Sequence, residues 1–238
     1  HETQLPTAFS FFSGKRFVPI MMVVTIPFLA IVMFFVWPLF NMVINGFGAL
    51  LASAGAFGTF IYGFLERLLI PTGLHHILNQ LIRFTPIGGS AMIDGQQVSG
   101  ALNIFNTLLM QAEPDMDVMR QATRFLTQGT HPFMVFGLPA ACYAMYKTAL
   151  PKNKQKVKGI LLAAGLTSLF TGITEPIEFS FFFISPLLWL FHAFMAGMSF
   201  LINSLLGVCI GNAGGGLIDL MLFGVLRGPQ TKWLLNVA

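Results

Sequence analysis

The chain has 238 residues, of which 55% are hydrophobic and only 9% are charged, and its formal net charge is +4. An ordinary soluble domain carries about 25% charged residues, so this composition excludes a soluble globular enzyme and indicates a membrane protein. No Asp, Glu, Lys or Arg occurs from Phe17 to Leu65 or from Phe179 to Ile218. Each run can hold two spans of about 20 residues, and barrel strands alternate over short segments instead. The predicted fold is therefore all-α, with several transmembrane helices.

The N-terminal part begins with residues 1–16, where aromatic side chains are followed by two basic ones. We expect an interfacial linker or amphipathic segment here, with its basic end among the lipid headgroups. The first predicted span covers residues 17–40, and its three prolines are expected to kink the helix or mark its ends. Residues 46–65 are rich in Gly, Ala and Ser, a composition that permits close packing against other helices.

A first interrupted apolar segment follows. Glu66 and Arg67 end the uncharged run, and His75 and His76 come after an intervening proline and glycine. Ionisable groups within a broken apolar segment are expensive in lipid, so they are expected to face a cavity, a partner or a ligand.

Residues 85–124 lose hydrophobic character and contain several glycines and acids. We predict a long extramembrane excursion, and excursions of this length are usually functional, often as a cover over a site. The next polar stretch, Lys147 to Lys158, holds five lysines between two apolar runs. Such a cluster could bind nucleic acid, but in this position it more often marks a cytoplasmic loop. Cys142 and Cys209 lie in apolar runs and are interpreted as packing residues.

The second interrupted segment is Gly172 to Pro186, in which Glu175 and Glu178 sit among residues otherwise suited to lipid. Pro176 lacks a backbone N–H and disfavours helix at the residue before it, so the preceding helix is expected to break here. Gly172 eases that break. The sequence thus predicts two re-entrant segments, and paired interruptions of this kind indicate the binding site of a transporter.

A shared site requires the two segments to converge, so we predict that His75 and Glu175 approach a common point within about 6 Å. Glu175 can accept two hydroxyl hydrogens, as a sugar edge presents them, or can be a structural acid paired with Arg67 or a histidine. Arg67 can donate to a ligand or pair with Glu66 or Glu175. Thr174 offers a further hydroxyl.

Three other ionisable residues are weighed as structural. Glu178 is interpreted as a helix-terminal or structural acid, and His131 and His192 as satisfied structural histidines near span ends. Neighbouring His75 and His76 point in different directions on a helix, and no third ligand lies at suitable spacing in the sequence. We therefore expect no metal site, and we expect no cofactor.

Several motifs in one order carry a family resemblance. They are Gly172–Phe179 (Gly-Ile-Thr-Glu-Pro-Ile-Glu-Phe), Phe11–Pro19, Glu66–His76 and Gly137–Ala141. Together they resemble the membrane (IIC) component of phosphoenolpyruvate-dependent sugar phosphotransferase systems, glucose superfamily, over nearly the whole chain. Two further stretches, Ile82–Thr85 and Ala122–Gly129, look most like the maltose and α-glucoside branch.

This resemblance implies a multi-pass protein of a bacterial cell membrane. The chain would be the C-terminal, sugar-binding half, a transport domain over residues 17–238 that is truncated at both ends relative to the family. The missing N-terminal half implies a homodimer. Glu175 and His75 match sugar-contacting positions of the family, and Arg67 matches a position near the sugar.

The implied activity is uptake of maltose or a related α-glucoside, coupled to phosphorylation by a phosphocysteine of a separate IIB domain. Glu175 would then orient the sugar hydroxyl or act as a general base toward it. Glucose or N-acetylglucosamine are the alternative substrates. An ion-coupled transporter using Glu175 and a purely structural membrane subunit are alternatives from other classes.

Overall fold

The computed structural model describes residues 3–4, 6–212 and 214–237, and almost all of its regular structure is helical. The chain divides into two compact units, His1–Phe47 and Gly48–Ala238. Two helical stretches of the described residues, Gly14–Leu51 and Pro186–Leu206, are long and apolar enough to cross a membrane. The all-α prediction is confirmed, whereas a larger number of spans stays a prediction.

The first unit consists of two short 3₁₀ turns, Thr7–Phe12 and Gly14–Arg16, and most of helix α1, Phe17–Ser53. We expected the prolines to kink the first span or mark its ends and placed its end at residue 40. That end was wrong, because α1 continues past both Pro27 and Pro38. Its apolar side chains are exposed, with Val23 at 73% and Phe34 at 74%, as suits a surface that lies against lipid or other apolar groups.

The first interrupted segment comprises helix α2, Gly55–Leu68, a 3₁₀ turn over Ile70–Thr72, and helix α3, His75–Phe84. Helix α2 packs against helix α9, Pro186–Leu206, over much of its length. At this contact a Cβ on Gly63 of α2 would lie 3.2 Å from the carbonyl oxygen of Ala196 on α9. The small residues predicted to allow close packing do so here.

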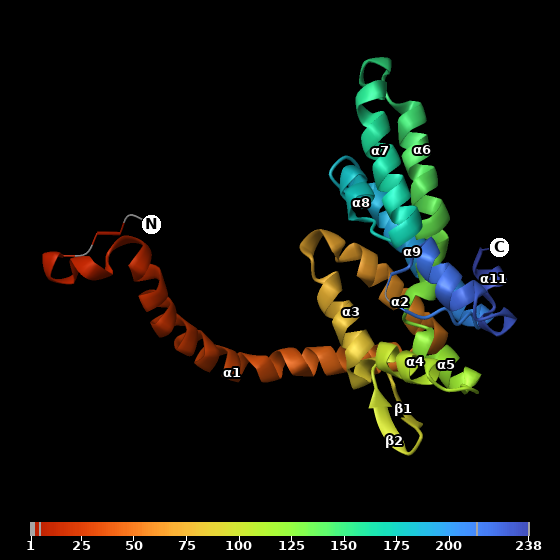
Figure 1. Ribbon diagram of the computed structural model, residues 1–238, viewed down its shortest axis with the longest axis horizontal. Coiled ribbons are helices and arrows are strands. Elements are labelled where there is room, and N and C mark those ends of the chain that lie inside the picture. The colour runs from red at the N-terminus through yellow and green to blue at the C-terminus, as the bar shows by residue number, and fades with distance from the viewer. Residues whose placement is uncertain (1–2, 5, 213, 238) are drawn as a thin grey trace. The chain divides into compact units, whose positions relative to one another are not determined.

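The predicted excursion contains regular structure. Strands β1, Ser90–Ile93, and β2, Gln96–Ser99, pair antiparallel with Ile93 opposite Gln96 (Figure 1). The turn between them is Asp94-Gly95, and both residues have positive φ (51° and 77°), as a two-residue hairpin turn requires. Helices α4, Ala101–Leu109, and α5, Met116–Thr123, complete the excursion.

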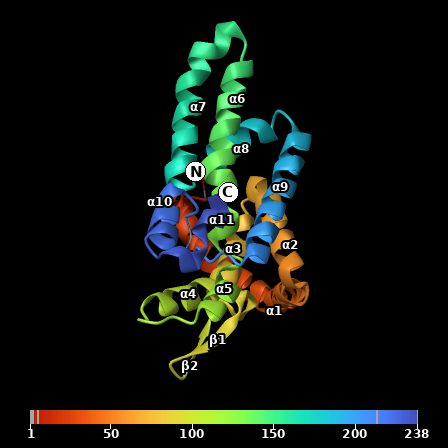
Figure 2. The same cartoon turned by 90° about the vertical axis from the view of Figure 1, so that its right-hand side faces the viewer.

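The remaining helices form the second half of the larger unit. A π-helical turn over Pro132–Gly137 leads into α6, Leu138–Thr148, which lies beside α7, Pro151–Thr171, in both views of the chain (Figures 1 and 2). The other elements follow in order: α8, Glu175–Phe182; α9; α10, Leu217–Asp219; a π-helical turn, Leu220–Val225; a 3₁₀ turn, Pro229–Thr231; and α11, Trp233–Val237.

An apolar core joins both interrupted segments. It unites side chains from the turn after α2 with side chains from α6, α7, α8 and α9. Its buried members are Ile70, Leu138, Cys142, Ala164, Ile177, Phe181 and Trp189. Cys142 is thus a packing residue, as predicted, and Cys209 is also buried with a free thiol. This core fixes the turn at Ile70 against α8, which brings the ionisable groups of the two segments together.

Candidate functional site

The second interruption lies where the sequence predicted it. Helix α7 ends at Thr171, Gly172 adopts a left-handed conformation with φ 75°, and α8 begins at Glu175 with Pro176 in its first turn. A proline is favourable there because the first helical N–H groups have no partner within the helix. A Cβ on Gly172 would lie 2.5 Å from the carbonyl oxygen of Gly214, so only glycine fits this break.

The first interruption also depends on a glycine in the left-handed conformation. Helix α2 ends at Leu68, and Gly73 adopts φ 74° before α3 starts at His75. This break therefore places Glu66 and Arg67 in the last turn of α2 and His75 at the start of α3. The ionisable residues of the motif lie at helix ends that surround the break.

Arg67 is the centre of a buried network that crosses between the segments. Its Nη1 donates to Glu178 Oε1 at 2.9 Å and to Thr174 Oγ1 at 3.1 Å. Its Nη2 lies 3.1 Å from Oε2 of Glu66. The Thr174 hydroxyl in turn donates to the second oxygen of Glu178 at 2.9 Å. These side chains are almost fully buried, so the interactions are screened little by solvent.

His192 on α9 completes the contacts of Glu178. Its Nε2 lies 2.9 Å from Oε1 of that carboxylate, and its ring packs edge-on against Phe133 and Phe181. An ionised carboxylate only accepts hydrogen bonds, so Nε2 carries the hydrogen. The guanidinium carbon of Arg67 lies 5.0 Å from the centre of the Phe133 ring, within cation–π range.

A polar chain extends from the network into α3. Asn79 Nδ2 donates to Glu66 Oε1 at 3.2 Å, and the Tyr62 hydroxyl donates to Asn79 Oδ1 at 2.6 Å. The cavity beside Tyr62 and Glu66 has a volume of about 20 Å³, which is room for about one water. This cavity therefore has no room for a sugar.

A second group of functional side chains lies beside the network. One ligand atom from each of His75, His76 and Glu175 lies within 4.8 Å of the others. The predicted convergence of His75 and Glu175 is thereby confirmed. His75 is 7% exposed, and its buried Nδ1 has no hydrogen-bond partner among the residues that the structure describes. Glu175 is half-buried and accepts the N–H of Thr174 at 3.1 Å. Unused donor and acceptor capacity from the two interrupted segments therefore lies close together.

Two expectations need correction. The structural alternative for Arg67 was a pair with Glu66 or with Glu175. The pair with Glu66 is present, but the second partner is Glu178, because Glu178 faces α2 while Glu175 lies beside the histidines. We expected no metal site because His75 and His76 would point in different directions and no third ligand lies at suitable spacing in the sequence. Their ring centres are in fact 4.0 Å apart, and Glu175 supplies a third donor from another helix. The expectation that the site works without metal stays a prediction.

The sequence did not predict that the ionisable groups around Arg67 form one buried network. Glu66 lies beside Arg67 in the motif Glu66–His76, but its hydrogen bond to Asn79 depends on the turn between α2 and α3. Glu178 and His192 were correctly interpreted as structural groups, yet nothing in the sequence indicated that they contact each other. A histidine in an otherwise uncharged apolar run is the one signal that could have suggested a buried acidic partner.

Comparison with known proteins decides the family. The family model for the phosphotransferase system, EIIC, matches residues 1–197, which include both interrupted segments. The chain belongs to this EIIC family. Its relatives include the PTS system maltose-specific EIICB component of Escherichia coli strain K12, 46% identical over 98% of this chain and 44% of the relative.

Two further relatives of this EIIC chain are glucose-specific EIICBA components from Staphylococcus saprophyticus and Staphylococcus carnosus. Each is 43% identical over 98% of this chain and 34% of the relative's own length. The chain thus spans less than half the length of these curated relatives. The family inferred from the motifs is confirmed.

Proposed function

We propose that this EIIC chain binds a sugar between its two interrupted segments and carries it across the membrane for phosphorylation. One observation carries this proposal: a ring nitrogen of His75 and a carboxylate oxygen of Glu175 lie within 4.8 Å of each other. Arg67, which hydrogen bonds to Thr174, lies nearby. The half-buried carboxylate can accept hydrogen bonds from sugar hydroxyl groups, and the buried imidazole nitrogen can accept or donate one. Neighbouring hydroxyl groups of one pyranose ring can satisfy both side chains.

The two groups of side chains have different tasks in this proposal. Glu175 and His75 contact the sugar directly. Arg67 is held by Glu66 and Glu178, so its remaining donor capacity has a defined direction toward the sugar. Thr174 connects the groups because its hydroxyl bonds to Arg67 and Glu178 while its N–H bonds to Glu175.

We propose maltose or a related α-glucoside as the substrate. The support is the maltose-specific relative at 46% identity, together with the two sequence stretches that look like the maltose branch. The glucose-specific relatives at 43% identity make glucose the main alternative. A few pocket contacts set such a preference, so only binding measurements separate the two sugars.

Phosphorylation requires a donor, and the relatives' names include a B component. We propose that a IIB phosphocysteine is this donor. The sugar oxygen attacks phosphorus, the phosphorus–sulfur bond breaks to leave the thiolate, and the hydroxyl proton passes to Glu175 or to water. Phosphoryl transfer depends mainly on positioning, so orientation of the hydroxyl is the main task of Glu175.

The membrane arrangement is part of the proposal. Segments α2–α3 and α7–α8 would be re-entrant, since broken backbone at membrane depth is tolerated where it lines a cavity. We further propose a multi-pass protein of a bacterial cell membrane that forms a homodimer through segments outside this chain.

Binding of maltose, glucose, sucrose and N-acetylglucosamine to the purified protein tests the proposed function. We expect maltose to bind most tightly, without dependence on sodium or on a proton gradient, and phosphorylated sugar to form only when phosphorylated IIB is added. Sugar uptake driven by an ion gradient without phosphorylation would favour the ion-coupled alternative. Absence of binding for all four sugars would overturn the proposal.

A further inference from the structure

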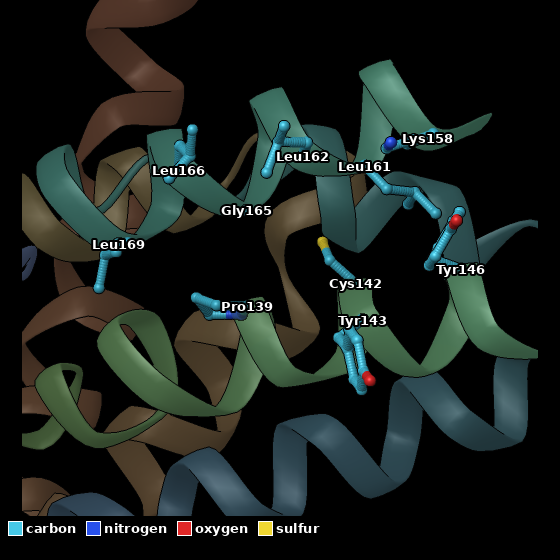
Figure 3. A pocket seen from close by; sticks show the side chains of 10 residues that line it. All are labelled: Pro139, Cys142, Tyr143, Tyr146, Lys158, Leu161, Leu162, Gly165, Leu166 and Leu169. Atoms are coloured by element: carbon cyan, nitrogen blue, oxygen red, sulfur yellow. The ribbon is translucent and has the colours of Figure 1, made fainter. Parts of the chain in front are cut away.

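A second hollow lies between α6 and α7, away from the residues of the sugar site. We call it the α6–α7 groove, and its volume is about 280 Å³ (Figure 3). Tyr146 and Lys158 lie toward one end, Tyr143 lies near the middle, and the rest of the lining is apolar (Figure 3). The lining residues are Pro139, Cys142, Tyr143, Tyr146, Lys158, Leu161, Leu162, Gly165, Leu166 and Leu169.

The groove exists because small residues face each other at its centre. A Cβ on Gly165 of α7 would lie 3.6 Å from Cβ of Cys142 on α6, which is ordinary contact distance. The Cys142 side chain extends toward α7 in Figure 3. Leucines on α7 beside this point stay exposed, with Leu162 at 59% and Leu166 at 44%. The groove is therefore an apolar channel that opens sideways to its surroundings.

Positive charge gathers at the end of the groove near the helix connection. Lys158 lines the groove, the Lys147 ammonium lies 5.2 Å from the ring centre of Tyr143, and that of Lys154 lies 5.1 Å from Tyr146. No acidic residue occurs in the sequence between Asp117 and Glu175. Within the described part of the chain, no ion pair involves a lysine of this loop. None of the acidic side chains that the structure describes therefore neutralises the charge at this end.

We propose that the α6–α7 groove binds an anionic phospholipid, with one acyl chain between the helices and the phosphate at Lys158 and the neighbouring lysines. The apolar part from Pro139 to Tyr146 covers roughly 10 Å of helix, enough for several methylene groups. A soluble phosphate would leave this apolar channel unfilled, and a zwitterionic lipid would leave the lysine charge uncompensated. Clusters of basic residues beside a membrane segment are a typical site for anionic headgroups.

The native thiol of Cys142 reports occupancy without any substitution. In nanodiscs that contain phosphatidylglycerol, a membrane-permeant maleimide should label Cys142 more slowly than in nanodiscs of phosphatidylcholine alone. We expect labelling to be at least about fivefold slower, because even one lysine beside the headgroup contributes roughly 1 kcal/mol to lipid binding. Labelling of Cys209, buried elsewhere in the chain, should be equal in both lipids. Equal labelling of Cys142 in both lipids would overturn the proposal.

Two variants test the lysine end and the apolar part of the groove separately. Native mass spectrometry measures the phosphatidylglycerol bound to each variant. Lys158→Gln should weaken its binding about fivefold and reduce the preference over phosphatidylcholine, because one ammonium is lost. Gly165→Leu should abolish binding by filling the groove. Gly159→Leu is the matched control, since a Cβ at Gly159 meets nothing within 4 Å and the residue does not line the groove.

A third arm distinguishes a lipid from its headgroup. Soluble glycerol phosphate, added in excess, should neither protect Cys142 nor displace the lipid, since it lacks the acyl chain. Protection by glycerol phosphate alone would show an anion site and overturn the lipid assignment. Unchanged lipid binding by Gly165→Leu would equally overturn it. None of these measurements involves sugar, so their outcome is separate from that of the proposed function.

Discussion

Arg67 and Glu178 form an ion pair of 2.9 Å although they are 111 residues apart in the sequence. This contact joins the last turn of α2 to the first turns of α8, and its side chains are 4% and 0% exposed. The pair therefore links the two interrupted helices directly.

Arg67→Ala is expected to destabilise the protein strongly. It leaves the buried carboxylates of Glu66 and Glu178 without their cation, and breaking one partner of a buried pair costs about 3–5 kcal/mol. Thermal unfolding in detergent measures the effect. Arg120→Ala is the control, because its pair with Asp117 is on the surface and is worth about 0–1 kcal/mol. Equal losses for the two variants would contradict a structural role for the Arg67 network.

Glu175→Gln is expected to weaken sugar binding by about 1.5–3 kcal/mol, the value of hydrogen bonds to a charged group. Stability should change little, since Glu175 is half-buried and takes no part in the Arg67 ion pairs. If Glu175 only orients the sugar, IIB-dependent turnover at saturating sugar should be nearly unchanged. If it is also the base, turnover should fall by roughly a further 100-fold.

Calorimetric sugar affinity and single-turnover phosphorylation separate these roles of Glu175. Glu113→Gln, an exposed acid between α4 and α5, is the matched control and should behave as wild type. Wild-type affinity and turnover for Glu175→Gln would remove this residue from the site.

Gly172→Ala is expected to destabilise the break before α8. The residue has φ 75°, a conformation that costs an L-residue about 1–2 kcal/mol, and its Cβ would meet the Gly214 carbonyl oxygen at 2.5 Å. Gly159→Ala is the control, because that glycine is exposed within α7 and alanine there should stabilise the helix by up to about 1 kcal/mol. Unfolding temperatures that shift in the same direction would argue against the strained break.

The lysine loop is predicted to be cytoplasmic, since basic residues between membrane segments remain on that side. A cysteine at Asn153, in a background with Cys142 and Cys209 replaced by alanine, reports its location. An impermeant maleimide should label Asn153→Cys only after the cells are permeabilised. Efficient labelling in intact cells would place the loop outside.

Local rules were enough to predict a large part of this protein. The uncharged runs predicted helices because a backbone in lipid has to satisfy its own hydrogen bonds. Gly172 and Pro176 predicted the break before Glu175. Glycine frees the backbone and proline restricts it, and neither effect depends on distant contacts. The same rule failed for α1, where Pro27 and Pro38 lie inside one continuous helix. A missing hydrogen bond lowers helix stability there without ending the helix.

Only the tertiary structure decided which ionisable groups meet. Glu175 and Glu178 lie in the same short helix, and both were possible partners for a cation in the sequence. The rotation of α8 against α2, set by the apolar core around Ile70 and Ile177, directs Glu178 to Arg67 and Glu175 to His75. The bond between His192 and Glu178 has the same origin, because α9 packs on both α2 and α8. Long-range packing energy selects these contacts, and no local pattern in the chain encodes them.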